Sequence, residues 1–307
     1  MKVAITGASG FLGSYVLQRL AAGGDVEVLA LLRNPESAWR TRDVLERVRV
    51  CRADLGDDSS YAGALRAFAP THLVHLAWEG VAGRNRNDAA QYRNVDRTLR
   101  LLENALAAGA RHFIGLGSQA EYGPCAQRID ETEATRPTTM YGAAKLATCL
   151  LAERLCTVSN ARFAWLRLFS SYGPMDNPDW MIPYLARSLL RGERPSVTRA
   201  EQRWDYIYID DAAHAVEAVA RAPAARGVFN LGSGTAPVLK DVIELIRGEV
   251  DPRASIGYGE VPYRPDQVMH LEANIERITG ATGWLPATPL PEGIRRTVDW
   301  YRNHAAG

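Results

Sequence analysis

The stretch TGASGFLG, residues 6–13, decides the fold because three glycines join an apolar run to a helical pattern over 11–22. In a strand–turn–helix context, Gly7 permits a sharp turn and Gly10 lets backbone amides approach a pyrophosphate. Gly13 lets the helix and the strand pack closely. The N–H groups at the helix N-terminus favour phosphate. Because this is the first strand and the first helix, a bound dinucleotide is favoured over a glycine-rich turn without a ligand.

Short apolar runs alternate with longer amphipathic segments over the first two thirds of the chain. Strands that are apolar throughout and separated by helices are typical of a parallel sheet covered on both faces. The predicted fold is therefore α/β, a doubly wound (Rossmann) parallel sheet. The predicted strands are 2–6, 26–32, 48–51, 72–76, 111–117 and 163–169, and the predicted helices are 11–22, 60–68, 91–107 and 139–157.

The sequence changes character after about residue 173, where proline and glycine become frequent and the alternation becomes irregular. We predict a dinucleotide-binding Rossmann domain over 1–173 and a smaller C-terminal substrate-binding lobe over 174–307. Residues of about 205–232 and 268–272 are expected to return to the first domain. A closing helix at about 290–303 is expected to pack on the second lobe.

Composition excludes several classes of function. Lys and Arg (36) balance Asp and Glu (35) to a net charge of +1, so no nucleic-acid partner is expected. No apolar run reaches the roughly 18 residues of a membrane span, and the start of the chain lacks a signal-peptide pattern. We therefore expect a cytoplasmic protein. The cysteines form no CxxC pair and are interpreted as thiols of a reducing compartment, with no metal site; they are Cys51, Cys125, Cys149 and Cys156.

The end of the second predicted strand, ALLRN at residues 30–34, bears on the choice of dinucleotide. In such folds an acidic side chain at this place selects NAD. Here no carboxylate is present, and the guanidinium of Arg33 suits a 2′-phosphate. NADP(H) is therefore favoured over NAD(H). The alternative is a solvated arginine at a strand end.

Three further residues combine into a candidate catalytic group. Tyr141 and Lys145 lie four positions apart in a predicted helix and so share a face. An ammonium near the phenol is expected to lower the pKa of Tyr141 from about 10 toward neutrality. Tyr141 could then exchange a proton with a carbonyl or alcohol oxygen. Ser118, at the end of a central strand, could donate a hydrogen bond to the same oxygen.

These motifs resemble those of the extended short-chain dehydrogenase/reductases, the NAD-dependent epimerase/dehydratase family, over nearly the whole chain. The segments that carry the resemblance are TGASGFLG, ADL (53–55), HLAW (75–78), NVDRTLRLLENA (94–105), GSQAEYG (117–123), YGAAK (141–145), LRLFSSYGP (166–174), WDYIYIDDAAHA (204–215), FNLGSG (229–234) and RPD (264–266).

The resemblance implies a role for each matching position. Ser118, Tyr141 and Lys145 would be the catalytic triad, and the C-terminal lobe would bind a nucleotide-diphosphate sugar. A homodimer would form through a four-helix bundle built from about 91–107 and 139–157. The implied cofactor contacts are Gly7, Gly10, Phe11, Leu12, Gly13, Arg33, Asp54, Leu55, Leu76, Ala77, Trp78, Tyr141 and Lys145.

Departures from the family pattern narrow the reaction. Sugar 4,6-dehydratases of the family carry Asp-Glu directly after the catalytic Ser or Thr, whereas this chain has Gln119 and Ala120. Neither side chain transfers a proton at neutral pH, so dehydration is disfavoured. The related 3,5-epimerase/4-reductases have a cysteine at the position of Ala120. A 4-keto reductase and a C4 epimerase with tightly bound NAD remain.

Arg33 without a neighbouring carboxylate suits an exchangeable NADPH and net reduction. We therefore favour NADPH-dependent reduction of the 4-keto group of a nucleotide-diphosphate 4-keto-6-deoxyhexose. A C4 epimerase is the alternative. A non-catalytic NADP-sensing regulator is disfavoured, since such proteins typically lose the tyrosine or the lysine, and both Tyr141 and Lys145 are present.

The candidate substrate contacts come from the later part of the chain and from the triad. Ser118 is expected to contact the substrate oxygen, and Ser170 replaces an asparagine that often contacts the sugar. Arg203 and Arg264 are candidates for gripping the pyrophosphate, with solvated surface arginines as the alternative.

Two tryptophans and a histidine near these motifs could belong to the site or to the core. Trp78 and Trp180 could line the sugar site, although packing in a core is an equal alternative. His75 lies inside an apolar strand and is interpreted as a core histidine, not as a catalyst.

Overall fold

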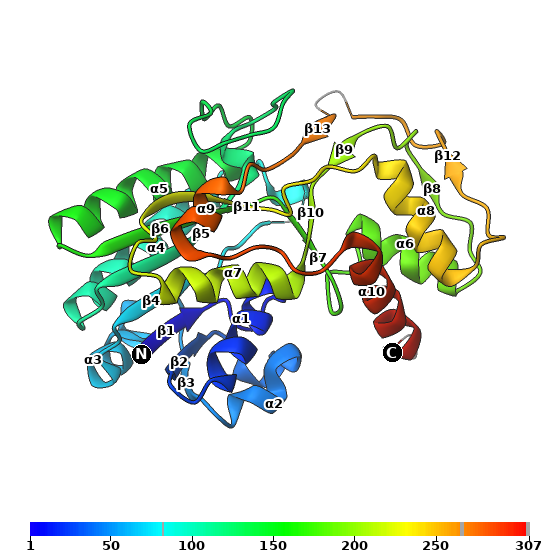
Figure 1. Ribbon diagram of the computed structural model, residues 1–307. Helices are drawn as coiled ribbons and strands as arrows, with labels where there is room; N and C mark the ends of the chain where they lie inside the picture. Colours follow the sequence, from blue (N-terminus) through cyan, green and yellow to red (C-terminus); the bar gives the residue numbers. More distant parts are fainter. Residues whose placement is uncertain (82, 265–266, 305–307) are drawn as a thin grey trace.

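The computed structural model describes residues 1–81, 83–264 and 267–304 (Figure 1). Its centre is a seven-stranded sheet in the order β11-β6-β5-β4-β1-β2-β3, in which all neighbouring strands are parallel. This order confirms the predicted doubly wound sheet. The strands are β1 (Lys2–Thr6), β2 (Glu27–Leu32), β3 (Arg49–Arg52), β4 (His72–His75), β5 (His112–Ser118), β6 (Arg162–Leu168) and β11 (Gly227–Leu231).

Helices cover both faces of this sheet. One face carries α1 (Phe11–Ala22) and α7 (Ile209–Arg221), and the other carries α3 (Ala62–Phe68), α4 (Gln91–Ala107) and α5 (Met140–Val158). In β1, Val3 and Ile5 belong to the core under α1 and α7, whereas Ala4 belongs to the core under the other three helices. A strand buried on both faces needs apolar residues at every position, which is why the run has no polar alternation.

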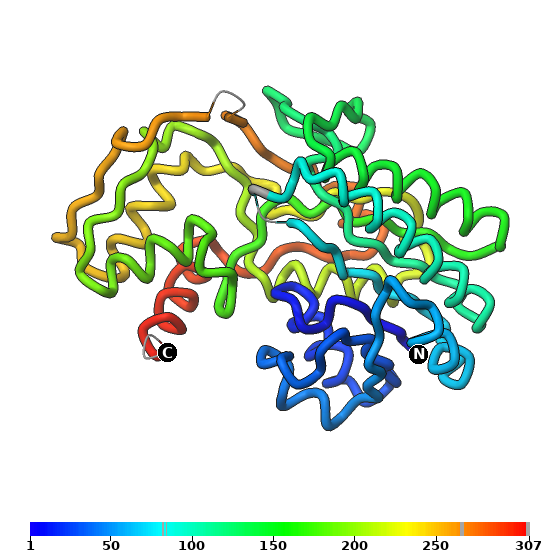
Figure 2. The backbone as a smooth tube through the Cα atoms, turned by 180° about the vertical axis from the view of Figure 1, so that it is seen from behind, coloured from blue at the N-terminus to red at the C-terminus, as the bar shows by residue number. Residues whose placement is uncertain are grey.

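The second lobe lies beside the sheet, and Figure 2 shows the same two parts from behind. It contains α6 (Met181–Leu190), α8 (Leu239–Val250) and α10 (Leu290–His304), and α10 packs against the other two, as expected for the closing helix. Two-stranded parallel sheets complete it, pairing β8 (Ser196–Val197) with β12 (Gly257–Tyr258) and β9 (Arg203–Trp204) with β13 (His270–Leu271).

The segments expected to return to the first domain behave differently from one another. Helix α7 and strand β11 do lie on the main sheet. The start of 205–232 does not join it, because β10 (Tyr206–Tyr208) pairs with β7 (Ser170–Tyr172). Strand β13 likewise pairs with β9, so the expectation for 268–272 is wrong. The sheet edge beside β6 is already taken by β11, and the short later segments pair with each other instead.

The remaining elements are short and connect these layers. They are α2 (Arg42–Leu45), α9 (Glu276–Thr282) and the 3₁₀ turns η1 (Pro35–Ser37), η2 (Trp39–Thr41), η3 (Asp58–Ser60), η4 (Gly83–Asn85) and η5 (Gln119–Glu121). Across the described residues, no helix has the length and apolar character that a membrane crossing requires.

Candidate active site

The turn between β1 and α1 has no space for side chains at two of its glycines. Gly7 adopts φ = 74°, and a Cβ there would lie 2.6 Å from the backbone nitrogen of Ala77. A Cβ on Gly13 would overlap the carbonyl oxygen of Gly7. Gly10 precedes α1 and cannot cap it with a side chain, so the first N–H groups of the helix stay available to a ligand. This cradle fits the diphosphate of a dinucleotide.

A pocket of ≈ 360 Å³ opens beside this turn, at the carboxyl ends of β1, β2 and β4. The structure brings together here eleven of the thirteen residues that were predicted to contact the cofactor; they are Gly7, Gly10, Phe11, Leu12, Gly13, Arg33, Asp54, Leu55, Leu76, Ala77 and Trp78. The other two, Tyr141 and Lys145, do not line it. They lie next to Trp78, which lines the pocket and whose indole ring contacts both Lys145 and Tyr141.

Arg33 does not stand alone at the rim of the pocket. Its Nη1 lies 2.7 Å from Oε1 of Glu79, and Oε2 of the same carboxylate lies 2.6 Å from Nη1 of Arg97. All three side chains line the pocket. Arg33 is thus exposed and ion-paired, and two guanidinium groups share one carboxylate. Neither Glu79 nor Arg97 stood out in the sequence, because nothing local marks two residues 18 positions apart as partners.

Ser118, Tyr141 and Lys145 are buried together on the α4–α5 side of the sheet. Ser118 is the last residue of β5, and its Oγ accepts a hydrogen bond from the backbone N–H of Ala120 at 3.2 Å. Helix α5 begins directly before Tyr141 because Thr139 caps it, its Oγ1 accepting from the N–H of Gly142 at 3.1 Å.

The Lys145 ammonium is bound by groups other than Tyr141. Its Nζ donates to the carbonyl oxygen of Leu116 at 2.6 Å and lies 3.8 Å from the centre of the Trp78 ring. Trp78 is fixed in turn, since its Nε1 donates to Oε1 of Gln91 at 2.9 Å. Burial lowers the pKa of Lys145 to about 7. Lys145 therefore carries only part of a positive charge near neutral pH.

The environment of Tyr141 differs from the prediction. Burial raises the pKa of the phenol above its ordinary value, whereas a hydrogen bond with Ser118 and the charge of Arg86 act in the opposite direction. Lys145 was expected to lower this pKa, but its Nζ lies 5.9 Å from the centre of the phenol ring and is turned to Leu116 and Trp78. The prediction failed because the four-residue spacing fixes a shared helix face but not what the ammonium binds.

Glu121 is a residue that the sequence analysis missed. Its fully buried carboxylate accepts from the backbone N–H of Ser118 at 2.8 Å, from Nε1 of Trp165 at 2.9 Å and from Nε of Arg167 at 2.8 Å. It thereby fixes the end of β5 and the turn that carries Ser118. The Ser-x-x-Glu spacing from Ser118 to Glu121 is that of a capping box, and this signal could have identified it.

Polar residues on α4 hold the segment after β4. Gln91, Asn94 and Thr98 are all buried. The side chain of Asn94 bonds both the N–H and the carbonyl oxygen of Glu79, at 3.1 Å each. His75 lies between Thr6 and Thr98, with ring nitrogens 2.8 and 2.9 Å from their hydroxyls. Burial lowers the pKa of His75 to about 3, as suits a neutral core histidine.

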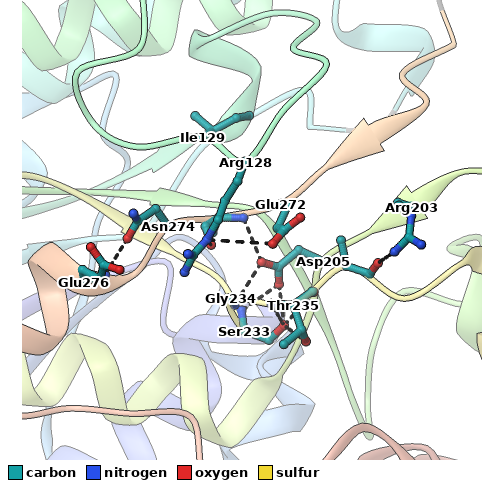
Figure 3. Close-up of polar contacts among 12 residues, drawn as sticks. Arg128, Ile129, Arg203, Asp205, Ser233, Gly234, Thr235, Glu272, Asn274 and Glu276 are labelled. Atoms are coloured by element: carbon teal, nitrogen blue, oxygen red, sulfur yellow. Dashed lines mark hydrogen bonds and ion pairs between the residues drawn. The ribbon is translucent and has the colours of Figure 1, made fainter.

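Asp205 joins the two parts of the molecule (Figure 3). Its Oδ1 accepts from the backbone N–H and the hydroxyl of Ser233, at 2.6 and 2.7 Å, and its Oδ2 accepts from the N–H groups of Gly234 and Ala273, at 3.1 and 3.0 Å. The carboxylate is fully buried. These bonds link the segment between β9 and β10 to the loop after β11 and to Ala273, so Asp205 has a structural role.

The four later substrate candidates lie apart from the pocket beside the β1–α1 turn. Nη1 of Arg203 donates to the carbonyl oxygen of Ala236 at 3.1 Å (Figure 3), and Oγ of Ser170 accepts from Nε1 of Trp204 at 2.7 Å. Trp180 precedes α6 and is 43% exposed, and Arg264 is exposed. The rest of its motif, residues 265–266, lies outside the described residues. Neither the dinucleotide pocket nor a second cavity near Tyr206 is lined by any of the four.

Comparison with known proteins extends this picture. The sequence profile of the NAD dependent epimerase/dehydratase family matches residues 3–232. A dTDP-glucose 4,6-dehydratase of Streptomyces griseus is 29% identical, with 98% of this chain and 94% of the relative covered. A dTDP-L-rhamnose 4-epimerase of Burkholderia thailandensis is 27% identical, with 97% and 94% covered. The crystal structure of Thermus thermophilus UDP-glucose 4-epimerase with NAD has a TM-score of 0.86 at 26% identity, over 98% of this chain and 99% of that chain.

Proposed function

Because this chain belongs to the NAD dependent epimerase/dehydratase family, we propose that it converts a nucleotide-diphosphate sugar with a nicotinamide dinucleotide and with Ser118, Tyr141 and Lys145 as its catalytic triad. The names of its relatives specify dTDP-glucose, dTDP-L-rhamnose and UDP-glucose as their sugar nucleotides. The glycine cradle and the adjoining pocket support the cofactor, and the burial of the triad beside Trp78 supports proton transfer in a site shielded from water.

The reaction we propose is NADPH-dependent reduction of the 4-keto group of a 4-keto-6-deoxyhexose nucleotide. The observation that carries it is the pair of guanidinium groups, Arg33 and Arg97, at the rim of the dinucleotide pocket. They share the single carboxylate of Glu79, so a 2′-phosphate could take its place as their common partner. Net reduction requires an exchangeable reduced dinucleotide, and these two guanidinium groups favour NADPH over NADH.

Tyr141, Ser118 and Glu121 have separate roles in the proposed reduction. The glycine turn and the adjoining pocket would hold NADPH, which would supply the hydride for the carbonyl carbon. Tyr141 donates its proton to the oxygen of the new alcohol, and Ser118 donates a hydrogen bond to the same oxygen. Glu121 fixes the position of Ser118 through its backbone N–H, at 2.8 Å.

Dehydration is disfavoured although a dehydratase is among the relatives. Gln119 and Ala120 follow Ser118 where those enzymes carry an acid and a base. Glu121 does not replace them, since its carboxylate faces the core and is bonded to Trp165 and Arg167. With no carboxyl free beside the hydroxyl of Ser118 in this turn, no group there can remove and return the proton that elimination of water involves.

A C4 epimerase with tightly bound NAD is the second candidate. Two of the relatives reported above are named as 4-epimerases, and one is a complex with NAD. The same triad would serve this reaction, with Tyr141 acting first as a base and then as an acid. The two candidates differ in whether the cofactor leaves the protein oxidised after each turnover.

The cofactor preference has its own test, in which binding is measured without a substrate. We expect Arg33→Ser to weaken 2′,5′-ADP about tenfold, since one bidentate partner of the phosphate is lost. Binding of ADP, which lacks the 2′-phosphate, should change little. The affinities of both ligands for the wild-type and Arg33→Ser proteins are measured by calorimetric titration. An equal loss of affinity for 2′,5′-ADP and ADP would show that Arg33 does not select NADP(H).

We also propose that the protein forms a homodimer through α4 and α5. Large apolar side chains are exposed on this layer, among them Tyr92 (60%), Leu150 (55%), Leu151 (48%) and Val158 (80%). Two helices from each protomer would bury them in a four-helix bundle. Light scattering should give twice the chain mass, and Leu151→Glu should reduce it to a monomer.

The function itself is tested by incubating the protein with NADPH and a dTDP-linked 4-keto-6-deoxyhexose. We expect one NADPH to be oxidised for each sugar reduced. Interconversion of UDP-glucose and UDP-galactose without added cofactor would establish the epimerase instead.

A further inference from the structure

Tyr141 is enclosed by groups from four different parts of the chain. On its own helix lies Lys145, and from the ends of β4 and β5 come Trp78 and Ser118. The edge-to-face contact with Trp78 has a ring-centre distance of 6.2 Å and an interplanar angle of 88°. The fourth group is Arg86, in the loop between β4 and α4, whose guanidinium carbon lies 4.8 Å from the centre of the phenol ring.

Two cations lie near Tyr141, namely Arg86 and Lys145. Arg86 is closer to the phenol ring, and its charge does not change with pH. The Nζ of Lys145 is 5.9 Å from the ring centre and is bound to the carbonyl oxygen of Leu116 and the face of Trp78. Burial also lowers the pKa of Lys145 to about 7, so its charge is incomplete at neutral pH. An arginine keeps its charge at every pH at which the protein is folded.

The loop that carries Arg86 is attached to the start of the catalytic helix. The carbonyl oxygen of Arg86 accepts from the backbone N–H of Tyr141 at 2.8 Å. Oδ1 of Asn87 accepts from the N–H of Met140 at 3.1 Å. Gln91 holds the same loop from the other side, donating to the carbonyl oxygens of Gly80 and Asn85 at 2.9 and 3.1 Å. The backbone of the loop that carries Arg86 is therefore fixed to the start of α5 on one side and to α4 on the other.

Within the described part of the chain, the guanidinium of Arg86 forms no ion pair with a carboxylate. Its Nε is buried, and no hydrogen-bond partner for this atom occurs among the residues that the structure describes. The other arginines near the pocket, Arg33 and Arg97, are both paired with Glu79. A half-buried cation that lies over a phenol ring in this way stabilises negative charge on the phenol oxygen.

We propose that Arg86 is a positioning residue whose permanent charge stabilises the phenolate that Tyr141 becomes when it gives up its proton. This rests on the proposed role of Tyr141 as the proton donor. Of the charged groups near the phenol, Arg86 favours the phenolate and Glu121, beneath Ser118, opposes it. Lys145 lies on the same helix, but its Nζ is 5.9 Å from the ring centre and is bound to Leu116 and Trp78. His75 faces Lys145 from β4 and stays neutral, because burial lowers its pKa to about 3.

The first test follows the phenol itself and needs no substrate. A fluorotyrosine placed at position 141 gives a single fluorine NMR signal whose shift reports ionisation. We expect Arg86→Met to raise the pH of this transition by about one unit, and Arg86→Lys to leave it close to the wild-type value. The matched control is Arg93→Met, which removes a guanidinium from the exposed ring of Tyr92, 5.9 Å away, and should leave the transition unchanged.

The second test is kinetic. In reduction Tyr141 must be protonated, so activity is lost as the pH rises through its pKa, and Arg86→Met should move this alkaline limb upward. At neutral pH kcat should fall about tenfold with KM unchanged, since a less acidic phenol donates its proton more slowly.

Three results would overturn the role of Arg86. One is an unchanged fluorine transition in a folded Arg86→Met protein. Another is a rise in KM alone, which would make Arg86 a substrate contact. The third is a failure of Arg86→Lys to restore the transition, which would make the effect one of packing. If the fluorine result holds but no sugar nucleotide is turned over, the proposed function is wrong and the contact of Arg86 with Tyr141 stands.

Discussion

Gly13 and Gly248 are both glycines inside helices, one in α1 beside the dinucleotide pocket and one in α8 of the second lobe. A methyl group at Gly13 would overlap the carbonyl oxygen of Gly7, whereas a methyl group at Gly248 would meet nothing within 4 Å. The pocket is thus shaped by contacts between backbone atoms, which constrain the sequence position by position. The second lobe is joined to the first part by side-chain contacts such as those of Asp205.

The largest expected difference between the two regions is catalytic. Tyr141→Phe removes the proposed proton donor and should lower kcat by about 10³-fold, within the range for general acid catalysis, while dinucleotide affinity changes little. Tyr184→Phe, on the exposed surface of α6, should leave kcat unchanged. Steady-state kinetics and a dinucleotide titration of both variants check this. Turnover within a few-fold of wild type in Tyr141→Phe would contradict the assigned role.

The next effect concerns the junction between the regions. Asp205→Ala leaves three backbone N–H groups, of Ser233, Gly234 and the buried Ala273, without their acceptor. We expect the free energy of unfolding to fall by about 3 kcal/mol or more. Urea denaturation measures it. The control is Asp251→Ala, which removes an exposed carboxylate that accepts from the N–H of Arg253. An equal loss of unfolding free energy in both variants would show that the bonds of Asp205 stabilise the protein no more than an exposed contact does.

Replacing the two helical glycines tests the comparison directly. Gly13→Ala should lower the free energy of unfolding by about 2 kcal/mol through overpacking, and it should also weaken dinucleotide binding. Gly248→Ala should raise the free energy of unfolding by about 1 kcal/mol, because alanine favours the helix and the site has room. Thermal and urea unfolding of the two variants should therefore move in opposite directions, and a shared direction would refute the contrast.

A smaller effect is expected in the pH dependence of stability. The folded protein releases the Lys145 proton near pH 7, whereas the unfolded chain keeps it until near its ordinary 10.5. In this window the unfolded state binds more protons, so the free energy of unfolding rises with pH. Lys145→Met should remove up to about 1.4 kcal/mol per pH unit of this rise.

The control for that measurement is Lys240→Met, in α8 of the second lobe, where the side chain lies over Tyr258. Urea unfolding at several pH values between 7 and 10 should show the same slope for this variant as for the wild type. An unchanged slope in Lys145→Met would mean that the buried lysine keeps its proton.

Features that depend on local sequence were predictable. The strands of the main sheet follow from apolar runs, and Gly7 and Gly13 follow from a turn that excludes any Cβ. Features that join distant segments were not. Nothing in the sequence indicates that the Lys145 ammonium lies over the Trp78 ring. Nor does it indicate that the guanidinium of Arg86 lies over the ring of Tyr141. Both depend on side-chain packing around the loop after β4, and the same is true of the pairing of β10 with β7.

The central claim is net reduction of a sugar carbonyl with proton donation from Tyr141, and transfer of an isotopic label tests it most directly. NADPH deuterated at the reactive carbon of the nicotinamide is mixed with the protein and a 4-keto-6-deoxyhexose nucleotide, and the product is examined by mass spectrometry and NMR. The account predicts one deuterium per product sugar, at C4, with labelled product formed about 10³-fold more slowly by the Tyr141→Phe protein. A product that carries no deuterium, or a sugar inverted at C4 while the NADPH stays unoxidised, would contradict it.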